Sequence, residues 1–218
     1  MINVLPTGSH ACKCAQSKHQ PKLVVLTGGP GGGKTAILEM ARRYFCRHVV
    51  ILPEAASIVF GGGFPRLETS EAKRCAQRAI YHVQRELERM AVESKAAVVL
   101  CDRGSIDGLA YWPGTHGNFF EEFGTSLKKE ISRYSAVIHV EVPTSASMYQ
   151  KNGIRHETVA EARALDRRIA RVWQSHPRQL VVSAQVGFLD KLAYAIELLR
   201  AEVPQCCRTH LHALAGKP

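Results

Sequence analysis

The sequence has no long hydrophobic run. In its 218 residues no apolar stretch approaches the roughly 18 residues that span a bilayer. Residues 1–20 also lack the hydrophobic centre of a signal peptide, and no internal repeat, low-complexity segment or interdomain linker is visible. These absences argue against a membrane-spanning or repeat protein. Because 45% of the residues are hydrophobic and 22% are charged, the chain can bury a sizeable core, and we expect one soluble, cytoplasmic domain.

Paired cysteines at the spacing of a structural zinc site are absent too. The seven cysteines are an odd number scattered along the chain, so we expect thiols rather than a disulfide framework. Cysteine and histidine gather near both ends of the chain. The first group is His10, Cys12, Cys14 and His19, and the second is Cys206, Cys207, His210 and His212. Neither contains a C-x₂-C pair, and both lie in segments that we expect to be flexible, so metal binding is predicted for neither.

Aromatic residues make up 7% of the chain and are not interleaved with its basic residues, which disfavours specific binding to nucleic acid. The net charge of +10 and the pI near 9.5 suit a protein that binds anions of another kind. Between Lys151 and Arg178, seven Lys or Arg residues stand against three acidic residues. This basic segment is where the sequence could hold a second anionic group.

One stretch is rich in glycine and matches the pattern G-x-x-x-x-G-K-[ST] at every fixed position. It is Gly28–Thr35, which directly follows the apolar run 22–27. Its glycines let successive backbone N–H groups approach an anion, Lys34 supplies a charge for the β- and γ-phosphates, and Thr35 supplies a hydroxyl for Mg²⁺. The nucleotide-binding residues that we expect are Gly28, Gly29, Pro30, Gly31, Gly32, Gly33, Lys34, Thr35 and Ala36. The pattern therefore predicts a bound nucleoside triphosphate, ATP or alternatively GTP.

Strands and helices alternate along the rest of the chain. Apolar runs predict strands over 22–27, 48–54, 96–102, 136–142 and 180–183, and helical periodicity predicts helices over 36–45, 70–94, 119–134, 158–174 and 188–202. This alternation predicts an α/β fold with a parallel sheet covered on both faces. We expect a flexible N-terminal arm over 1–21, the nucleotide-binding domain over 22–202 and a flexible C-terminal tail over 203–218.

Acidic residues end two of the predicted strands, at the sheet edge where ligands bind in such folds. Asp102 ends a run with the form of a Walker B strand and would hold Mg²⁺ directly or through water; alternatively it caps the next helix.

Arg103 follows in a run that resembles an element of nucleoside and nucleotide kinases, in which this Arg contacts phosphates or the acceptor; the alternative is a surface salt bridge. Glu54 stands where kinases of this architecture keep a carboxylate for the attacking hydroxyl, although it could instead orient water or cap a turn. Asp107 is expected to face solvent.

Five arginines lie on or beside the helix that the capping box Thr158-x-x-Glu161 opens. They are Arg155, Arg163, Arg167, Arg168 and Arg171. A basic segment closing over phosphates would supply transition-state charge and exclude water. The alternative is a solvated helix face balanced by nearby acids. We expect Arg155 to be the principal lid residue, followed by Arg163.

At this point the sequence resembles a known family, the P-loop domain shared by the ribosylnicotinamide-kinase module of NadR-like proteins and by animal TRP-translocation-defect-like proteins, a non-hexameric AAA-type domain. The resemblance covers about residues 22–200. It rests on Thr27–Thr35, Leu52–Ala56, Cys101–Asp107 with Ala110 and Tyr111, and Asn152, Arg155 and Glu157 leading to Glu161, Ala162, Leu165, Asp166, Val172, Trp173, His176 and Pro177. It implies a kinase-like three-layer sandwich with a mainly parallel central sheet, a small helical lid over about 150–175, and binding of ATP or GTP. The cysteine-bearing termini depart from it.

These observations together predict a Mg²⁺-dependent P-loop protein, kinase-like, that transfers the γ-phosphate of ATP to a small nucleoside- or nucleotide-like acceptor or hydrolyses it. Lys34, Glu54, Asp102, Arg103 and Arg155 are the predicted catalytic residues, with Thr35 and Asp102 holding the metal. The alternative is a nucleotide-gated binding module that recognises acidic lipid or a protein partner without phosphotransfer. The choice of base, the acceptor and the oligomeric state are left open.

Overall fold

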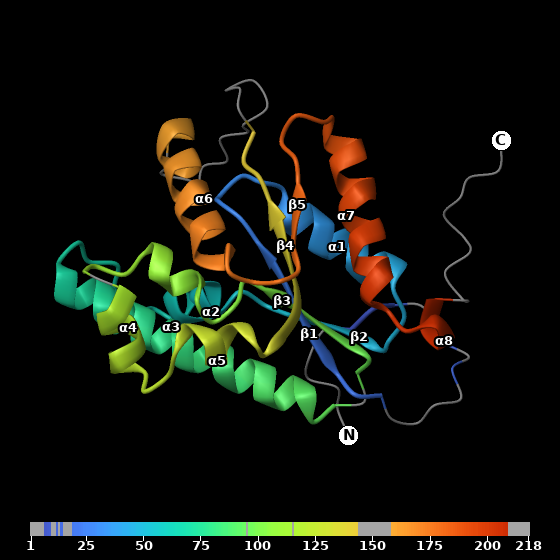
Figure 1. Ribbon diagram of the computed structural model, residues 1–218, viewed down its shortest axis with the longest axis horizontal. Coiled ribbons are helices and arrows are strands. Elements are labelled where there is room, and N and C mark those ends of the chain that lie inside the picture. The colour runs from blue at the N-terminus through green and yellow to red at the C-terminus, as the bar shows by residue number, and fades with distance from the viewer. Residues whose placement is uncertain are drawn as a thin grey trace.

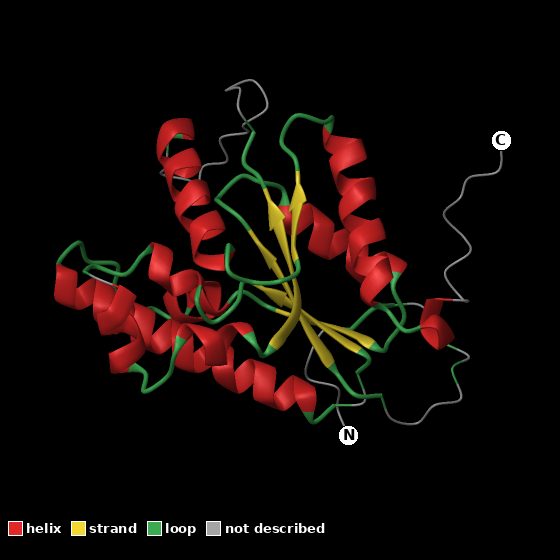
Figure 2. Cartoon of the chain, viewed as in Figure 1, coloured by secondary structure: helices red, strands yellow, loops and turns green. Residues whose placement is uncertain are grey.

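The computed structural model describes residues 7–9, 12, 14, 19–94, 96–114, 116–143 and 158–208, and its centre is a parallel sheet of five strands (Figures 1 and 2). The strands are β1 (Lys22–Thr27), β2 (Val49–Leu52), β3 (Val98–Asp102), β4 (Tyr134–Val140) and β5 (Gln179–Val182), in the spatial order β2-β3-β1-β4-β5. Their valines and isoleucines are almost all buried, as a sheet covered on both faces requires.

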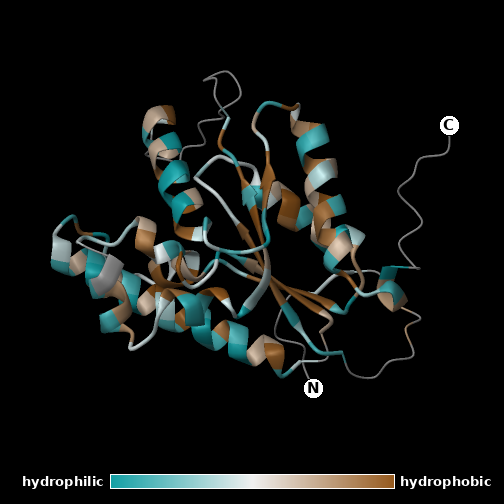
Figure 3. Ribbon diagram, viewed as in Figure 1, coloured by the Kyte–Doolittle hydropathy of each residue, from teal (hydrophilic) through white to brown (hydrophobic). Residues whose placement is uncertain are grey.

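Helices cover both faces of the sheet. On one face lie α1 (Lys34–Tyr44) and α7 (Phe188–Glu202), and on the other α3 (Ser70–Val92), α5 (Leu127–Ile131) and α6 (Val159–Trp173) (Figure 1). Further helices that the structure describes are α2 (Ala55–Gly61), η1 (Asp107–Ala110), α4 (His116–Glu122) and α8 (Gln205–Arg208). Figure 3 shows the hydrophobic strands enclosed between helices whose outer faces are hydrophilic. The predicted three-layer α/β sandwich is confirmed.

The strand register places the carboxyl ends of three strands beside one another. Leu26 of β1 pairs with Asp102 of β3, and Leu52 of β2 pairs with Cys101. The segments that follow β1, β2 and β3 therefore leave the sheet at the same edge. This arrangement brings the Gly28–Thr35 loop, Glu54 and Asp102–Arg103 together although they are far apart in the sequence.

The stretch 119–134, which is predicted to be largely helical, holds two helices instead of one. It contains most of α4, a turn and α5, and Tyr134 already begins β4. Gly124 adopts a positive φ of 55° after α4, a conformation that favours glycine at the end of a helix. Ser126 then caps α5 by accepting a hydrogen bond from Lys129 N. These two local signals divide a segment whose apolar residues alone suggest one continuous helix.

The two termini are partly described and pack on the domain. Thr7 forms an antiparallel bridge with Val50, and Gly8 N donates to Val49 O at 2.9 Å. Cys207 of α8 is fully buried. These parts of the arm and tail differ from the flexible segments that the sequence suggests, while flexibility of the other terminal residues stays a prediction.

The predicted lid falls partly outside the described residues. Its part from 150 to 157, with Arg155, is not described, and its remaining part is α6, opened by the capping box of Thr158 and Glu161 as predicted. Ile169 and Trp173 bury α6 against the sheet. Among the described residues, no helix is long and apolar enough to cross a membrane.

Candidate functional site

The loop between β1 and α1, residues 28–35, forms a cradle at the carboxyl edge of the sheet; we call it the phosphate loop. Gly28 has a φ of 132°, and a Cβ there would lie 2.2 Å from Val140 O. Gly33 has a φ of 102° and stands at the start of α1. No other residue type fits these two positions without strain. The backbone N–H groups at the N-terminus of α1 are thereby available to an anion.

Lys34 folds back over the phosphate loop. Its Nζ donates to Gly28 O at 2.8 Å and to Gly29 O at 2.9 Å, and the side chain is buried. Burial and the nearby Arg103 lower the pKa of Lys34 to about 8. The next residue, Thr35, is exposed on the same loop. The Lys34 ammonium therefore lies within the loop, where it donates to two backbone carbonyl oxygens.

Asp166 of α6 braces the phosphate loop, a role that the sequence analysis missed. Its Oδ1 accepts from Gly29 N at 2.7 Å and lies 3.0 Å from His139 Nε2, while its Oδ2 accepts from Val142 N at 3.2 Å. Burial opposes ionisation, but the bonds from His139 and the backbone lower the pKa of Asp166. The sequence does contain a signal for this role. Asp166 falls on the apolar face of its helix, four residues after Ala162 and three before Ile169, and a carboxylate buried there needs a partner.

Asp102, at the end of β3, has a buried oxygen that fits a metal ion. Among the residues that the structure describes, none donates a hydrogen bond to Asp102 Oδ1. Burial, and then the charge of Glu54, raise the pKa of Asp102 to about 6. An orphaned carboxylate oxygen near the exposed Thr35 hydroxyl is the kind of oxygen donor set that Mg²⁺ takes. The two residues predicted to hold the metal therefore suit it.

Asp107 is buried, so the expectation that it faces solvent is wrong. It is only 3% exposed; its Oδ1 accepts from the Thr27 hydroxyl and its Oδ2 from Gly104 N at 2.6 Å. The carboxylate thus joins the end of β1 to the turn after β3. That turn is the one that carries Arg103.

Arg103 forms an ion pair with Glu54 beside the phosphate loop. Arg103 Nε donates to Glu54 Oε1 at 2.6 Å, and Arg103 Nη1 donates to Gly28 O at 3.3 Å. The pair is mostly enclosed, with side-chain exposures of 14% for Arg103 and 28% for Glu54, so it is not a surface salt bridge. Burial opposes ionisation of Glu54, but Arg103 and the Ser57 hydroxyl lower the pKa of its carboxyl. Glu54 is therefore a carboxylate at neutral pH.

The backbone of Arg103 lies in the left-handed region, with a φ of 72°. This conformation is unfavourable for a residue with a side chain and persists where surrounding bonds hold it. Arg103 N donates to Leu26 O at 3.0 Å, and Gln84 Nε2 donates to Arg103 O at 3.2 Å. These bonds hold the guanidinium over the carboxyl edge of the sheet.

A cavity of about 560 Å³ opens beside these residues. It begins at Lys34 and Thr35, and Glu54, Asp102 and Arg103 form part of its wall. Its further walls come from α2, α3, the segment around η1 and α4, and include Phe60, Gln77, Tyr81, Gln84, Asp107, Tyr111 and Phe119. Aromatic rings and polar groups around a concave volume are typical of a small-molecule site.

The α6 arginines are distributed differently from the prediction. Arg168 lines the cavity, whereas Arg163, Arg167 and Arg171 are exposed on α6 and are not among the described residues of its wall. Arg163 was expected to rank next to Arg155, but Arg168 holds the better position. Arg155 itself lies outside the described residues.

Comparisons with known proteins agree with this fold. The structure is similar to that of NadR in complex with NR, with a TM-score of 0.62 and 19% identity over 85% of this chain and 52% of that one, so the chain spans about half the length of NadR. It is also similar to deoxyadenosine kinase from M. mycoides with bound dATP, with a TM-score of 0.56 and 15% identity over 82% of this chain and 98% of that one. No curated protein matches the sequence. The model of a family described as an AAA domain matches residues 23–191, and the chain belongs to that family.

Proposed function

We propose that this protein binds ATP with Mg²⁺ and transfers the γ-phosphate to a small nucleoside- or nucleotide-like acceptor. The observation that carries the proposal is the cavity of about 560 Å³ that adjoins the phosphate loop and has Glu54 and Arg103 in its wall. A protein that only hydrolyses or senses a nucleotide needs no further space next to the phosphates. A kinase needs such space, because the acceptor must meet the γ-phosphate in line.

The phosphate loop and Lys34 would hold the triphosphate. The loop amides and the positive end of α1 face the position of the phosphates, and Lys34 Nζ would exchange its bonds with Gly28 O and Gly29 O for phosphate oxygens. Thr35 and Asp102 would hold Mg²⁺, which when bound neutralises charge on the β- and γ-phosphates. Asp166 keeps Gly29 in place from behind.

Glu54 would orient the attacking hydroxyl of the acceptor. Because Arg103 lowers its pKa, Glu54 is a weak base that accepts a hydrogen bond at neutral pH rather than a group that removes a proton early. A loose transition state for phosphoryl transfer requires little more, since positioning supplies most of the catalysis. The Arg103 guanidinium has five N–H donors, and its hydrogen bonds to Glu54 and Gly28 use two of them. The others would stabilise the transferring phosphoryl group.

The cavity and the similar structures support this acceptor class. Phe60 and Tyr111 offer rings for a flat ring to pack against, while Gln77 offers amide groups for its edge. One similar structure is a deoxyadenosine kinase, and a further NadR structure, with a TM-score of 0.56 and 17% identity over 84% of this chain and 49% of that one, is bound to NAD and AMP-PNP. We propose Arg168 and Arg155 as the positive charges that close over the phosphates.

Incubation of the full chain with γ-labelled ATP or GTP, Mg²⁺ and a panel of nucleosides, nucleotides and ribosylnicotinamide tests the proposal. One acceptor should become labelled, and the label should be lost in Lys34→Ala but retained in Lys128→Ala, which removes an exposed lysine of α5. If neither nucleotide binds at millimolar concentration, the proposal is wrong. If nucleotide binds without turnover and controls capture by acidic vesicles or by a protein partner, the binding-module alternative replaces it.

A further inference from the structure

A second group of chemically reactive side chains lies far from the phosphate loop, at the amino end of β2. Cys46 and His48 belong to the turn that connects α1 to β2, and both are buried. Cys206 and Cys207 belong to α8, which follows α7, and Cys207 is fully buried. The phosphate loop occupies the carboxyl edge of the sheet, so these residues gather at the opposite end of the strands.

The N-terminal arm reaches the same place because Gly8 allows it. A Cβ at Gly8 would lie 2.3 Å from Phe45 O and 2.4 Å from Cys46 O, so the arm could not run this close with any other residue there. Gly8 N donates to Val49 O at 2.9 Å and fixes the contact. Beyond it the arm brings Cys12, Cys14 and His19 to Cys207 and His48. Three segments of the chain thus converge on a set that we call the Cys/His cluster. Its members are Cys12, Cys14, His19, Cys46, His48, Cys206 and Cys207.

The cluster divides into two groups of four that share Cys207. The first is Cys12, Cys46, His48 and Cys207, and the second is Cys14, His19, Cys206 and Cys207. In each group the potential ligand atoms all lie within 4.8 Å of one another. Each group therefore offers three sulfur atoms and one imidazole nitrogen, a donor set that is common in structural zinc sites.

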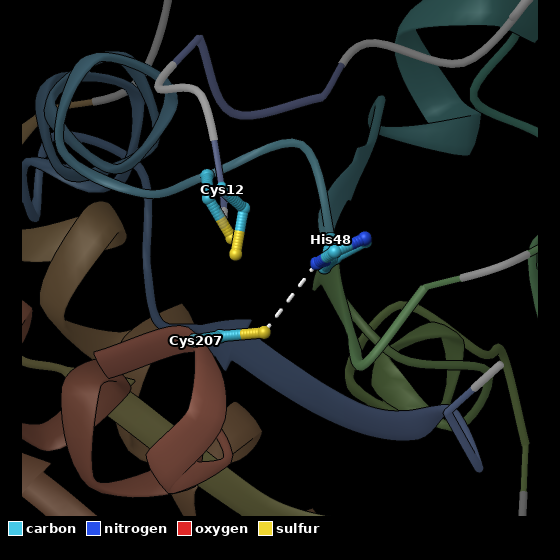
Figure 4. A group of neighbouring side chains, drawn as sticks. Cys12, His48 and Cys207 are labelled. Atoms are coloured by element: carbon cyan, nitrogen blue, oxygen red, sulfur yellow. Dashed lines mark hydrogen bonds between the residues drawn. The ribbon is translucent and has the colours of Figure 1, made fainter. Parts of the chain in front are cut away.

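Three sulfur–nitrogen distances match the edges of a zinc tetrahedron. With Zn–S bonds of about 2.3 Å and Zn–N bonds of about 2.0–2.1 Å, sulfur and nitrogen bound to one ion lie roughly 3.6 Å apart. Cys207 Sγ lies 3.4 Å from His48 Nδ1 and 3.7 Å from His19 Nε2, and Cys14 Sγ lies 3.7 Å from His19 Nε2. Figure 4 shows Cys12, His48 and Cys207, which come from three separate segments, pointing toward a common centre.

We propose that the Cys/His cluster binds two Zn²⁺ ions, each held by three thiolates and one neutral imidazole, with Cys207 Sγ bridging the two. Each of the five cysteines would release its thiol proton on coordination, and no electron transfer is involved. Zinc fits better than Mg²⁺ or Ca²⁺, because those ions take oxygen ligands. The histidine in each group also suits Zn²⁺, which binds imidazole as well as thiolate. The site would be structural, because all four positions around each ion come from the protein.

The proposal departs from the expectation that the cysteines and histidines of the termini bind no metal. Sequence spacing was a poor guide because the first group takes its ligands from three separate segments and the second from two, so no C-x₂-C pair is required. Cys46 and His48, which complete the first group, are distant in the sequence from both terminal groups. His10, His210 and His212 of the expected terminal groups lie outside the described residues.

Elemental analysis of the full chain, purified under reducing conditions without chelator, tests the stoichiometry. The wild type should retain two zinc ions per chain after dialysis against a weak chelator. Cys46→Ser and Cys14→Ser each remove a ligand of one group and should retain one, while Cys207→Ser should retain none. Cys75→Ser is the matched control, since Cys75 lies on α3 outside both groups, and it should retain two.

A second measurement does not depend on the folding of the variants. Wild-type protein reconstituted with Co²⁺ should show thiolate-to-metal charge-transfer absorption and the intense visible bands of a tetrahedral site. Absence of zinc together with absence of these bands overturns the proposal, and so does iron in place of zinc. If only one of the two variants Cys46→Ser and Cys14→Ser loses an ion, the bridged arrangement is wrong. A thiol count below seven in denatured wild-type protein would indicate disulfides instead and would also overturn it.

Discussion

At the scale of single residues, the Glu54–Arg103 pair defines what the proposed catalytic centre can do. An isolated buried glutamate would be protonated more readily, but Arg103 Nε at 2.6 Å from Glu54 Oε1 favours the carboxylate. The same guanidinium donates a hydrogen bond to the carbonyl of Gly28, so hydrogen bonds join Glu54, Arg103 and the phosphate loop. Substitutions at Glu54 should therefore affect the chemical step more than nucleotide binding.

Replacement of Glu54 by glutamine tests this division. Glu54→Gln keeps the size of the side chain but removes the charge, so the attacking hydroxyl loses its anionic acceptor and keeps only a weaker amide oxygen. We expect kcat for phosphotransfer to fall by about 10²-fold or more, while the affinity for ATP, measured by calorimetry, changes by less than about threefold. The matched control is Glu86→Gln, an exposed residue of α3 whose side chain is 59% accessible, and it should leave both quantities unchanged. Equal losses in kcat and ATP affinity would instead place Glu54 in nucleotide binding.

The sequence predicts some residues of the site and not others, for a physical reason. Lys34, Glu54, Asp102 and Arg103 follow strands, and the edge where parallel strands end can be inferred from the chain order alone. Asp107 and Asp166 depend on donors of other segments, the Thr27 hydroxyl and Gly29 N. Which donors lie opposite a carboxylate is decided by packing, and local patterns do not contain that information.

At the scale of elements, Asp166 couples α6 to the phosphate loop and to β4. Its two oxygens accept from Gly29 N and Val142 N and face His139 of β4. Because the pKa of folded Asp166 is below its ordinary value, ionised Asp166 stabilises the folded protein, and this stabilisation is complete at neutral pH. It is lost only as the pH falls through that lowered pKa.

Removal of the Asp166 carboxylate should loosen the phosphate loop without removing any group that touches phosphate. We expect Asp166→Ala to weaken ATP binding by about tenfold, equivalent to about 1.4 kcal/mol, measured by calorimetry at neutral pH. Asp166→Asn retains one acceptor and should lose less. The control is Asp190→Asn, which changes an exposed aspartate of α7. An Asp166→Ala protein with unchanged ATP affinity would show that the loop holds its shape without α6.

A second coupling between elements involves two buried carboxylates and one arginine. Glu88 of α3 and Glu130 of α5 are each 1% exposed, and Arg133, before β4, forms ion pairs with both. Tyr134 OH donates to Glu88 at 2.7 Å and Tyr81 OH to Glu130 at 2.9 Å. Arg133 is the closest positive charge to both acids, while Arg85 Nη1 lies 3.4 Å from Glu130 Oε2. Removal of Arg133 therefore removes the ion pair of Glu88 and weakens the charge compensation of Glu130.

Arg133→Met should therefore destabilise the fold strongly. Breaking a buried charge network by removing one partner costs about 3–5 kcal/mol, and we expect the free energy of unfolding in urea to fall by that amount. The matched control is Arg89→Met, which removes an exposed arginine of α3 that is paired with Glu86, and it should cost less than about 1 kcal/mol. Equal effects of the two substitutions would contradict a structural role for the network.

At the scale of the whole molecule, the sheet separates two sites. The nucleotide site stands at the carboxyl ends of β1, β2 and β3, and the Cys/His cluster stands at the amino end of β2. The alternation of strands and helices was enough to predict the sheet and therefore the first site. The second could not be predicted, because it is formed when Gly8 seats the arm on the α1–β2 turn and α8 brings the C-terminal cysteines to the same turn.

Removal of zinc should release both termini and leave the nucleotide site intact. In zinc-bound protein the ions would crosslink the arm, the α1–β2 turn and α8, whereas without them the arm is fastened chiefly by the Thr7–Val50 bridge and the bonds of Gly8 and Ser9. We expect a strong chelator to speed amide hydrogen exchange at least about tenfold in Thr7–Ser9 and Gln205–Arg208, with little change in β1 and β3. The exchange is measured by mass spectrometry. ATP affinity should stay within about twofold.

The Cys207→Ser variant should reproduce this exchange pattern without chelator, because it removes the ligand that both groups share. The Cys75→Ser protein should respond to chelator as the wild type does. Uniformly faster exchange across the sheet would mean that the ions hold the whole domain together rather than its ends. Unchanged exchange in the termini would mean that the packing of Gly8 and Cys207 is sufficient to hold them, and that the cluster does not act as a crosslink.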